Sequence, residues 1–264
     1  MFFNSKPEII FEGDSAYARI TIIDDNGTRT MYMGDNQEAE TSILIKNPLT
    51  PVFEYPGLFF LSLALRPQAR NIVMLGLGGG YIPRLCQLYL PDHQLTVVEI
   101  DPLVVELASV YFDFNPGANV KVEIADGLDY LTFLRPESVD VIWHDAFDGY
   151  YIPQHLATTT FLKLTRRVLK EDGLLTQNLH RTKPAAFMDQ LTITAEVFDE
   201  PSLLFYGSRS GNAVLISPNG PLDVPRGRAK LTKAAKAFGP KIGPYNLLAE
   251  IEKETAFPKV APCL

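Results

Sequence analysis

The alternation of apolar and polar residues changes its period near residue 50. Before that point, three short runs alternate as strands with one buried face do: YARITIID (17–24), TRTMYM (28–33) and TSILI (41–45). The DNG at 25–27 separates the first two runs and is a strong signal for a tight hairpin turn. Because an isolated hairpin is marginal in water, this β-hairpin domain, predicted over 1–50, needs a larger partner to pack against.

Beyond residue 51 the pattern becomes apolar runs of strand length, separated by stretches with helical periodicity. The expected strands are 71–77, 94–100, 120–125, 139–145 and 173–179, with helices over 102–112 and 155–170. Two closing strands, 202–207 and 212–218, leave no room for a helix between them and predict an antiparallel pair. Buried strands that alternate with helices predict a doubly wound, mostly parallel sheet over 51–221, followed by a helical and peripheral tail over 222–264.

Composition removes several classes of function. The chain of 264 residues carries a net charge of −7, which gives nucleic acid no electrostatic attraction. Its two cysteines lie far apart and its four histidines show no ligand spacing, so neither a disulfide framework nor a metal site is indicated. The longest apolar run, GLFFLSLAL (57–65), is too short to cross a bilayer, and the first ten residues lack the apolar core of a signal peptide. We therefore expect a cytoplasmic protein with no nucleic-acid or membrane partner.

Polar or glycine-rich segments follow four successive strands of the predicted sheet. They are GLGGG (76–80), Glu99 with Asp101, the ADG that contains Asp126 and Gly127, and Asp145 with Asp148. Each alone is ordinary, since a glycine-rich loop is often only a tight turn and a strand-end acid is often a helix N-cap. In a parallel sheet, however, ligands bind beyond the carboxyl ends of the strands. The succession therefore predicts a ligand site along that edge.

The residues after the first of these strands indicate which nucleotide fits. A dinucleotide fingerprint would carry its third glycine at Tyr81, whose ring prevents the close helix–strand packing that a glycine allows. Gly76 and Gly78 still let a ligand approach the backbone. Glu99 is placed for a ribose diol, and Asp126 for an adenine amino group. A nucleoside without a diphosphate, such as the adenosine sulfonium of S-adenosylmethionine, satisfies all of these positions.

Four segments in this order resemble the spermidine synthase (polyamine aminopropyltransferase) family: VMLGLGGGYIPRL, TVVEIDPLVVELASVYF, VEIADGLDYL and DVIWHDAFDGYYIP. The amino-terminal hairpins and MGDNQEAE (33–40) are similar to that family's small β domain and its L-D-G-x-x-Q segment. The likeness runs from about residue 10 to residue 218. It implies a Rossmann-like fold of the S-adenosylmethionine-type methyltransferase class, with a mostly parallel seven-stranded sheet and a small N-terminal β-hairpin domain.

The resemblance implies a role for each candidate residue. Asp145 corresponds to the general base, which attracts the ammonium of an amine and then accepts its proton. Asp148 corresponds to a partner that orients the same amine. Glu99 would hold the ribose, and Asp126 with Gly127 the adenine. The remaining candidates from the resemblance are Gln37 for the donor and Tyr55 for the amine. From residue type alone, Tyr150, Tyr151 and Trp143 are candidates for cation–π contacts with the amine, although simple packing is the commoner role of aromatic residues at such positions.

The chain departs from the family pattern in four places. Aligned on Arg84, the acid of the family's glycine-rich loop is replaced by Gly79. Pro56 stands where the family has His or Gln after its tyrosine, and Gly149 where it has the proline after D-x-x-D. The family's tryptophan-bearing carboxyl-terminal segment has no counterpart in YGSRSGNAVLI. In the family this loop acid binds the free amine of the decarboxylated donor. Its loss therefore leaves the identity of both the donor and the acceptor undefined by the sequence.

Three functions remain from the sequence. The first, favoured by the D-x-x-D pair and Gln37, is transfer of an aminopropyl group from decarboxylated S-adenosylmethionine to a polyamine amine such as putrescine, with 5′-methylthioadenosine as product. The second is a methyltransferase that uses whole S-adenosylmethionine, which the acid-free loop favours. The third is a non-catalytic nucleoside-binding homologue, in which D-A-F-D-G is only a turn. We expect no permanently bound cofactor, and the small hairpin domain predicts a homodimer.

Overall fold

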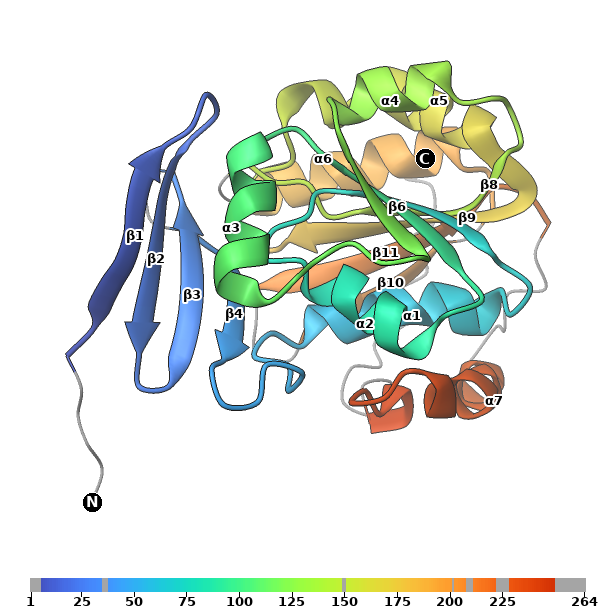
Figure 1. The fold of residues 1–264 in the computed structure, drawn as a ribbon. Helices are drawn as coiled ribbons and strands as arrows, with labels where there is room; N and C mark the ends of the chain where they lie inside the picture. The colour runs from blue at the N-terminus through green and yellow to red at the C-terminus, as the bar shows by residue number, and fades with distance from the viewer. Residues whose placement is uncertain are drawn as a thin grey trace.

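The computed structural model describes residues 6–34, 38–148, 151–200, 202–207, 211–221 and 228–249. They form two sheets that lie side by side (Figure 1). The first sheet is antiparallel in the order β1-β2-β3-β4, and its strands are β1 (Glu8–Asp14), β2 (Arg19–Asp25), β3 (Thr28–Met33) and β4 (Glu38–Leu44). Strand β1 lies outside the expected runs because its residues, EIIFEGD, do not alternate regularly between apolar and polar.

The hairpin turn predicted at 25–27 is confirmed. Asn26 and Gly27 have φ angles of 48° and 81°, both in the left-handed region that a type I′ turn requires. This two-residue turn fixes the register of β2 against β3, so that Ile22 lies opposite Met31 and both are fully buried. The apolar face of the first sheet is therefore turned inward, as its alternation predicts.

Strand β4 contains a β-bulge at Glu40. Ala39 pairs with Tyr32, and Thr41 pairs with the neighbouring Met31, so Glu40 has no residue opposite it. A bulge bends its strand and redirects the side chain of the extra residue. Because β4 is the strand of the first sheet that lies closest to the second sheet (Figure 1), the bulge changes what the second sheet encounters there.

The second sheet has seven strands in the order β10-β11-β9-β8-β5-β6-β7. They are β5 (Asn71–Leu75), β6 (Gln94–Glu99), β7 (Val120–Ile124), β8 (Val139–His144), β9 (Leu169–His180), β10 (Leu203–Tyr206) and β11 (Asn212–Pro218). Strands β5 to β9 run parallel, whereas β11 is antiparallel to both β9 and β10, as predicted for the closing pair. The order reverses between β5 and β8, and a ligand crevice forms at the carboxyl ends of strands at such a switch point.

Helices cover both faces of this sheet. One face carries α1 (Tyr55–Leu65), α2 (Tyr81–Tyr89) and α3 (Pro102–Phe112); the other carries α4 (Gly127–Phe133), η1 (Gln154–Leu156), α5 (Thr159–Val168) and α6 (Pro184–Val197). Helix α7 (Arg228–Phe238), followed by η2 (Gly239–Lys241), packs on α1 and buries Leu231, Ala235 and Phe238. Helix α7 therefore covers the outer side of an almost wholly apolar α1.

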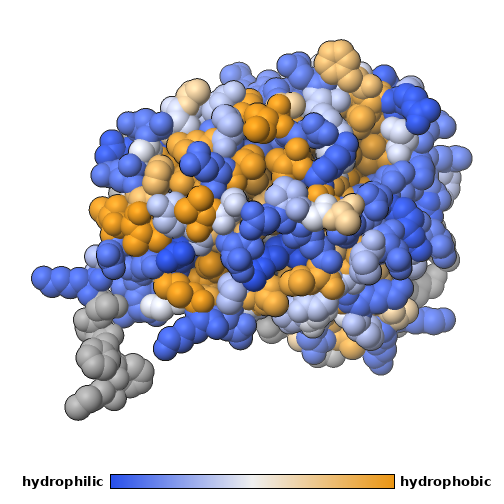
Figure 2. Space-filling view, in the orientation of Figure 1, coloured by the Kyte–Doolittle hydropathy of each residue, from blue (hydrophilic) through white to orange (hydrophobic). Residues whose placement is uncertain are grey.

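The predicted fold class is confirmed: a mostly parallel, Rossmann-like sheet of seven strands with a small antiparallel β sheet at its side. Helix α3 joins the two, because Arg29 of β3 donates a hydrogen bond to the carbonyl oxygen of Tyr111 at 2.9 Å. Apolar side chains are interspersed with polar ones on the face seen in Figure 2. Within the described residues, no helix combines the length and the apolar character needed to cross a membrane.

Candidate active site

Two cavities meet at the carboxyl ends of β5 and β8. The glycine-loop cavity, of about 350 Å³, is lined by the loop after β5 and by the ends of β6 and β7. The tyrosine cavity, of about 410 Å³, is lined by Tyr55, Tyr81 and the carboxyl end of β9, and by β4 of the first sheet. The residues that line both cavities are Glu40, Leu77, Gly78, Asp145 and Phe147. The site therefore lies at the predicted edge of the sheet, but residues of the first sheet form part of its wall.

Glycines with positive φ shape the loop after β5. Gly76 has a φ of 91°, and a Cβ at this position would lie 2.4 Å from the carbonyl oxygen of Asp145. Gly78 has a φ of 53° and lines both cavities. Side chains strain these conformations, whereas glycine adopts them freely and leaves the backbone open to a ligand. Both glycines are thus placed as predicted, while their contact with a ligand stays a prediction.

Gly79, which replaces the family's loop acid, lines neither cavity. A Cβ there would lie 2.6 Å from Cγ2 of Thr41 and 3.0 Å from the ring of Phe112. Thr41 belongs to β4 and Phe112 to α3, so the packing of the first sheet against the second fills the space beside this glycine. The loop has no room for a side chain at position 79 in this arrangement.

Glu99 ends β6 and lines the glycine-loop cavity with 8% of its surface exposed. Its Oε2 accepts a hydrogen bond from the backbone N–H of Leu77 at 2.8 Å, and its Oε1 one from that of Asp101 at 3.0 Å. Burial raises the pKa of Glu99, and these backbone donors partly offset the rise. Each carboxylate oxygen has a further lone pair, so the fixed carboxylate suits two neighbouring hydroxyl groups.

Asp101 and Asp126 are both helix N-caps. Oδ1 of Asp101 accepts from the backbone N–H of Leu103 at 2.9 Å, and Oδ1 of Asp126 accepts from those of Leu128 at 2.8 Å and Asp129 at 3.1 Å. Both residues also line the glycine-loop cavity. Oδ2 of Asp101 is buried without a hydrogen-bond partner among the described residues, and a ligand hydroxyl would satisfy it.

The second carboxylate oxygen of Asp126 lies 2.7 Å from Nε2 of His155. His155 belongs to η1 and also lines the glycine-loop cavity. Gly127 begins α4, and a Cβ there would lie 3.3 Å from the Leu75 side chain, so the start of the helix lies close to β5. Asp126 is therefore shared between a helix cap and a histidine, and its predicted contact with adenine requires the remaining lone pair of Oδ2.

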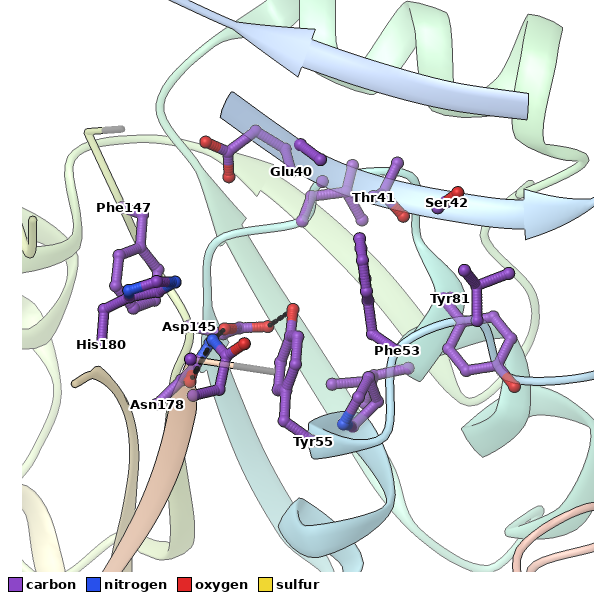
Figure 3. A pocket seen from close by; sticks show the side chains of 18 of the residues that line it. Glu40, Thr41, Ser42, Phe53, Tyr55, Tyr81, Asp145, Phe147, Asn178 and His180 are labelled. Atoms are coloured by element: carbon purple, nitrogen blue, oxygen red, sulfur yellow. Dashed lines mark hydrogen bonds between the residues drawn. The ribbon is translucent and has the colours of Figure 1, made fainter. Parts of the chain in front are cut away.

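Asp145 follows β8 and is half-buried in the wall common to both cavities (Figure 3). Nδ2 of Asn178 donates a hydrogen bond to its Oδ1 at 2.8 Å, and the hydroxyl of Tyr55 donates to its Oδ2 at 3.3 Å. Burial raises the pKa of Asp145 to about 7, although both hydrogen bonds favour the charged form. A carboxyl with this pKa gains and loses a proton at small cost near neutral pH, which is what a general base requires.

The two partners of Asp145 are themselves fixed. Asn178 of β9 is 2% exposed, and its Oδ1 accepts a hydrogen bond from Nδ2 of Asn212, on β11, at 3.0 Å. Tyr55 is the first residue of α1, and burial together with the charges of Asp145 and Glu40 raises its pKa well above 10. Tyr55 therefore stays protonated and acts as a hydrogen-bond donor. Side chains from α1, β9 and β11 hold the carboxylate in one orientation.

Asp148 lies apart from the hydrogen bonds around Asp145. It is exposed, its backbone N–H donates to the carbonyl oxygen of Tyr151 at 2.7 Å, and it lines the glycine-loop cavity but not the tyrosine cavity. Asp145 and Asp148 both line the glycine-loop cavity, and a role of Asp148 toward the amine stays a prediction. Gln37 and Tyr150 lie outside the described residues, so their predicted contacts also stay predictions.

The aromatic residues named for cation–π contacts lie elsewhere. Trp143 is fully buried on β8, and its Nε1 donates to Oγ of Ser62 at 2.9 Å, so of its two expected roles the structure supports packing in the core. Tyr151 lines neither cavity, and its ring lies 5.5 Å from Nζ of Lys183. His144 is also buried, and burial lowers its pKa to about 3, which keeps the ring neutral.

The sequence did not single out three residues of the site: Glu40, Asn178 and His155. For Asn178 a signal existed, because TQN (176–178) places three polar residues inside a strand that is otherwise apolar. Glu40 is one of several acids in MGDNQEAE, and its place in the bulge depends on strand register. His155 gives no signal, because its contact with Asp126 joins residues 29 positions apart.

The combined lining of the two cavities is acidic. Among the described residues that form it there is no lysine or arginine, and the carboxylates are Glu40, Glu99, Asp101, Asp126, Asp145 and Asp148. Carboxylates that gather in a concave, partly desolvated surface attract cations and repel anions. The site therefore suits positively charged ligands.

Known proteins resemble this chain in sequence. The model of the family described as spermine/spermidine synthase domain matches residues 58–192. A polyamine aminopropyltransferase from Vibrio vulnificus is 32% identical over 215 residues, which are 79% of this chain and 71% of that protein. The chain belongs to the spermine/spermidine synthase family. It spans 62% of the length of three further proteins named polyamine aminopropyltransferase.

Solved structures share the fold of this family member. The spermidine synthase from Thermotoga maritima superposes with a TM-score of 0.75 over 94% of this chain and 84% of that one, at 20% identity. Human methyltransferase-like protein 13, solved with SAH, superposes with a TM-score of 0.57 over 78% of this chain and 93% of that one, at 25% identity. Both likenesses agree with the Rossmann-like methyltransferase class of fold, and the broader coverage of this chain is by the spermidine synthase.

Proposed function

We propose that this protein transfers an aminopropyl group from decarboxylated S-adenosylmethionine to an amine such as putrescine. The observation that carries the proposal is the position of Asp145 on the wall shared by the two cavities. A base at this place reaches a nucleoside donor on one side and an amine acceptor on the other. Membership of the spermine/spermidine synthase family and the relative named polyamine aminopropyltransferase support the same reaction.

The donor binds in the glycine-loop cavity. Glu99, already oriented by two backbone N–H groups, accepts hydrogen bonds from the ribose hydroxyls, and the partnerless Oδ2 of Asp101 is available to the same sugar. Asp126 accepts from the adenine amino group, and Gly76 and Gly78 let the nucleoside lie against the backbone. The sulfonium carbon to be attacked then lies at the junction of the cavities, beside Asp145.

The acceptor amine enters the tyrosine cavity as an ammonium and is attracted to Asp145. Asp145 accepts one proton as the nitrogen attacks the carbon attached to the sulfonium. A nitrogen–carbon bond forms, the carbon–sulfur bond breaks, and its electron pair goes to sulfur, which leaves as the neutral thioether 5′-methylthioadenosine. Tyr55 and Asn178 hold the carboxylate in place through these steps, which removes an orientational cost from the reaction.

The raised pKa of Asp145 makes this proton transfer less costly. A lysine-like amine has a pKa of roughly 10, about six units above an ordinary aspartate. With Asp145 at about 7, the difference shrinks to about three units. At 1.36 kcal/mol per unit, this lowers the free energy of moving the proton by about 4 kcal/mol.

Methyl transfer from whole S-adenosylmethionine is the less favoured alternative. That donor carries an α-carboxylate, and no lysine or arginine lines either cavity within the described part of the chain. The family match also favours aminopropyl transfer. We further propose that the protein is cytoplasmic and forms a homodimer. Exposed apolar side chains on and beside the first sheet support the dimer: Ile9 of β1 is 58% exposed, and Ile45, directly after β4, is 42% exposed.

Transfer assays with the two donors test the proposal. Wild type should transfer an aminopropyl group from the decarboxylated donor to putrescine or spermidine. Asp145→Asn should lower turnover roughly 10²- to 10⁴-fold, the usual contribution of a positioned base, while 5′-methylthioadenosine still binds. The matched variant Asp148→Asn changes an exposed acid of the same loop and should act mainly on the apparent affinity for the amine. If wild type instead methylates an acceptor from whole S-adenosylmethionine and transfers no aminopropyl group, the proposal is wrong.

A further inference from the structure

Within the part of the chain that the structure describes, the junction of the two cavities carries charge of one sign only. Of the five described residues that line both cavities, Glu40 and Asp145 are charged, and both are carboxylates. A donor whose nucleoside fills the glycine-loop cavity must extend its sulfonium substituents across this junction to meet an amine in the tyrosine cavity. The far end of the donor's side chain therefore lies near Glu40 and Asp145.

The bulge in β4 turns Glu40 toward this junction. Ala39, Glu40, Thr41 and Ser42 are consecutive, and all four line the tyrosine cavity, which a regular strand with alternating faces does not readily allow. Glu40 is the extra residue of the bulge, and Figure 3 shows it on β4 across the cavity from Asp145 and Tyr55. Bulges next to active sites commonly redirect a side chain in this way.

The same strand explains why an acid for the donor cannot come from the glycine loop. Thr41 and Phe112 occupy the space beside Gly79, so the loop carries no side chain there. Thr41 is the residue after Glu40, so the strand that fills this space also supplies a carboxylate to the junction.

We propose that Glu40 binds the ammonium group of the donor's aminopropyl chain, and that the acidic junction rejects donors that keep an α-carboxylate. This proposal rests on the proposed function and names the donor that the site selects. An ammonium beside the Glu40 carboxylate forms charge-assisted hydrogen bonds in a partly desolvated site, which leaves Asp145 to the acceptor amine. The carboxylate of whole S-adenosylmethionine would instead face Glu40 and Asp145, and no described lining residue is a lysine or arginine that could neutralise it.

Three thioethers with a neutral sulfur separate these contributions without any turnover. 5′-Methylthioadenosine carries no charge on its side chain, 5′-(3-aminopropylthio)-5′-deoxyadenosine adds the ammonium, and S-adenosylhomocysteine adds the ammonium and the carboxylate. Calorimetry on the full chain should show wild type binding the aminopropyl compound roughly tenfold tighter than the other two. Glu40→Gln should lose about tenfold for the aminopropyl compound and less than about twofold for 5′-methylthioadenosine.

Two further variants sharpen the test. Glu12→Gln makes the same substitution in the first sheet, at an exposed residue paired with Arg19, and should leave all three affinities unchanged. Glu40→Lys should reverse the preference, with S-adenosylhomocysteine binding tighter than the aminopropyl compound. The proposal is overturned if Glu40→Gln weakens 5′-methylthioadenosine as much as the aminopropyl compound, or weakens neither.

The two proposals fail separately. If wild type transfers no aminopropyl group but the binding pattern holds, the proposed function is wrong and the role of Glu40 stands. If wild type transfers the group and Glu40→Gln binds the aminopropyl compound as tightly as wild type does, the role of Glu40 is wrong and the function stands.

Discussion

Replacing Asp145 by asparagine is expected to stabilise the protein at pH 8 while it removes the base. Burial raises the pKa of Asp145 from 3.8 to about 7, so between these values the folded chain holds a proton that the unfolded chain has lost. The stability contributed by this carboxyl is therefore fully present below about pH 4 and is lost as the pH rises through about 7. Asparagine stays neutral at every pH and avoids the loss.

The size of the gain follows from the pKa difference. About three pKa units at 1.36 kcal/mol each give an upper value of about 4 kcal/mol above pH 8. The carboxyl is only half-buried, so solvent screens part of its charge, and we expect about 2–4 kcal/mol. A chain of 264 residues shifts its Tm by about 2 °C per kcal/mol, which predicts a rise of roughly 4–8 °C.

Calorimetric unfolding of wild type and Asp145→Asn at pH 4 and pH 8 measures this difference. The gain in Tm should be large at pH 8 and close to zero at pH 4. Asp148→Asn is the matched control, because it neutralises an exposed acid three residues later and should change Tm little at either pH. If the gain in Tm is equal at both pH values, or if Tm falls at pH 8, burial of the charged Asp145 carboxylate does not destabilise the folded protein as argued.

Two further substitutions test the surroundings of the base. Tyr55→Phe removes a donor that favours the charged form of Asp145, so the pKa of Asp145 should rise and the acid limb of kcat/KM should move to higher pH by roughly 0.5–1 unit. Tyr81→Phe is its control, since Tyr81 lines the same cavity but donates to the carbonyl oxygen of Leu49. If the acid limb of kcat/KM does not move in Tyr55→Phe, the hydrogen bond from Tyr55 does not influence the pKa of Asp145. Gly79→Ala should lower the free energy of unfolding in urea by about 1–3 kcal/mol, because its Cβ meets Thr41. Gly239→Ala, with nothing within 4 Å of the new Cβ, should show no such loss, and equal losses would contradict the packing at Gly79.

The sequence predicts the second sheet well because each of its features is local. Buried parallel strands give apolar runs, the helices between them give a 3.6-residue period, and the short gap before 212–218 excludes a crossover helix. The edge on which the acids lie also follows, since strands of one parallel sheet end on the same side. The sequence alone therefore places Glu99, Asp126 and Asp145 at the correct edge of the sheet.

The inner arrangement of the site depends on contacts that no local pattern reports. Asn178 reaches Asp145 only because β9 lies beside β8, and Glu40 reaches the junction only because of a register shift in a different sheet. Trp143 stands two residues before Asp145 in sequence, yet the packing of α1 places it in the core. The spacing of Asp145 and Asp148 suggests a pair, and both line the glycine-loop cavity, but Asp145 also lines the tyrosine cavity whereas Asp148 does not.

The contact of Thr41 with Gly79 has a consequence for how related sequences can vary. A side chain at position 79 and a Thr41 methyl group cannot share the same space, because the Cβ alone would approach that methyl group to 2.6 Å. The two positions are then mutually exclusive, and a change at one is viable only with a change at the other. Chains of this kind should therefore divide into two groups: those with an acid in the glycine loop and a smaller or displaced residue on the strand, and those with a bare loop and a bulged strand that carries the acid itself.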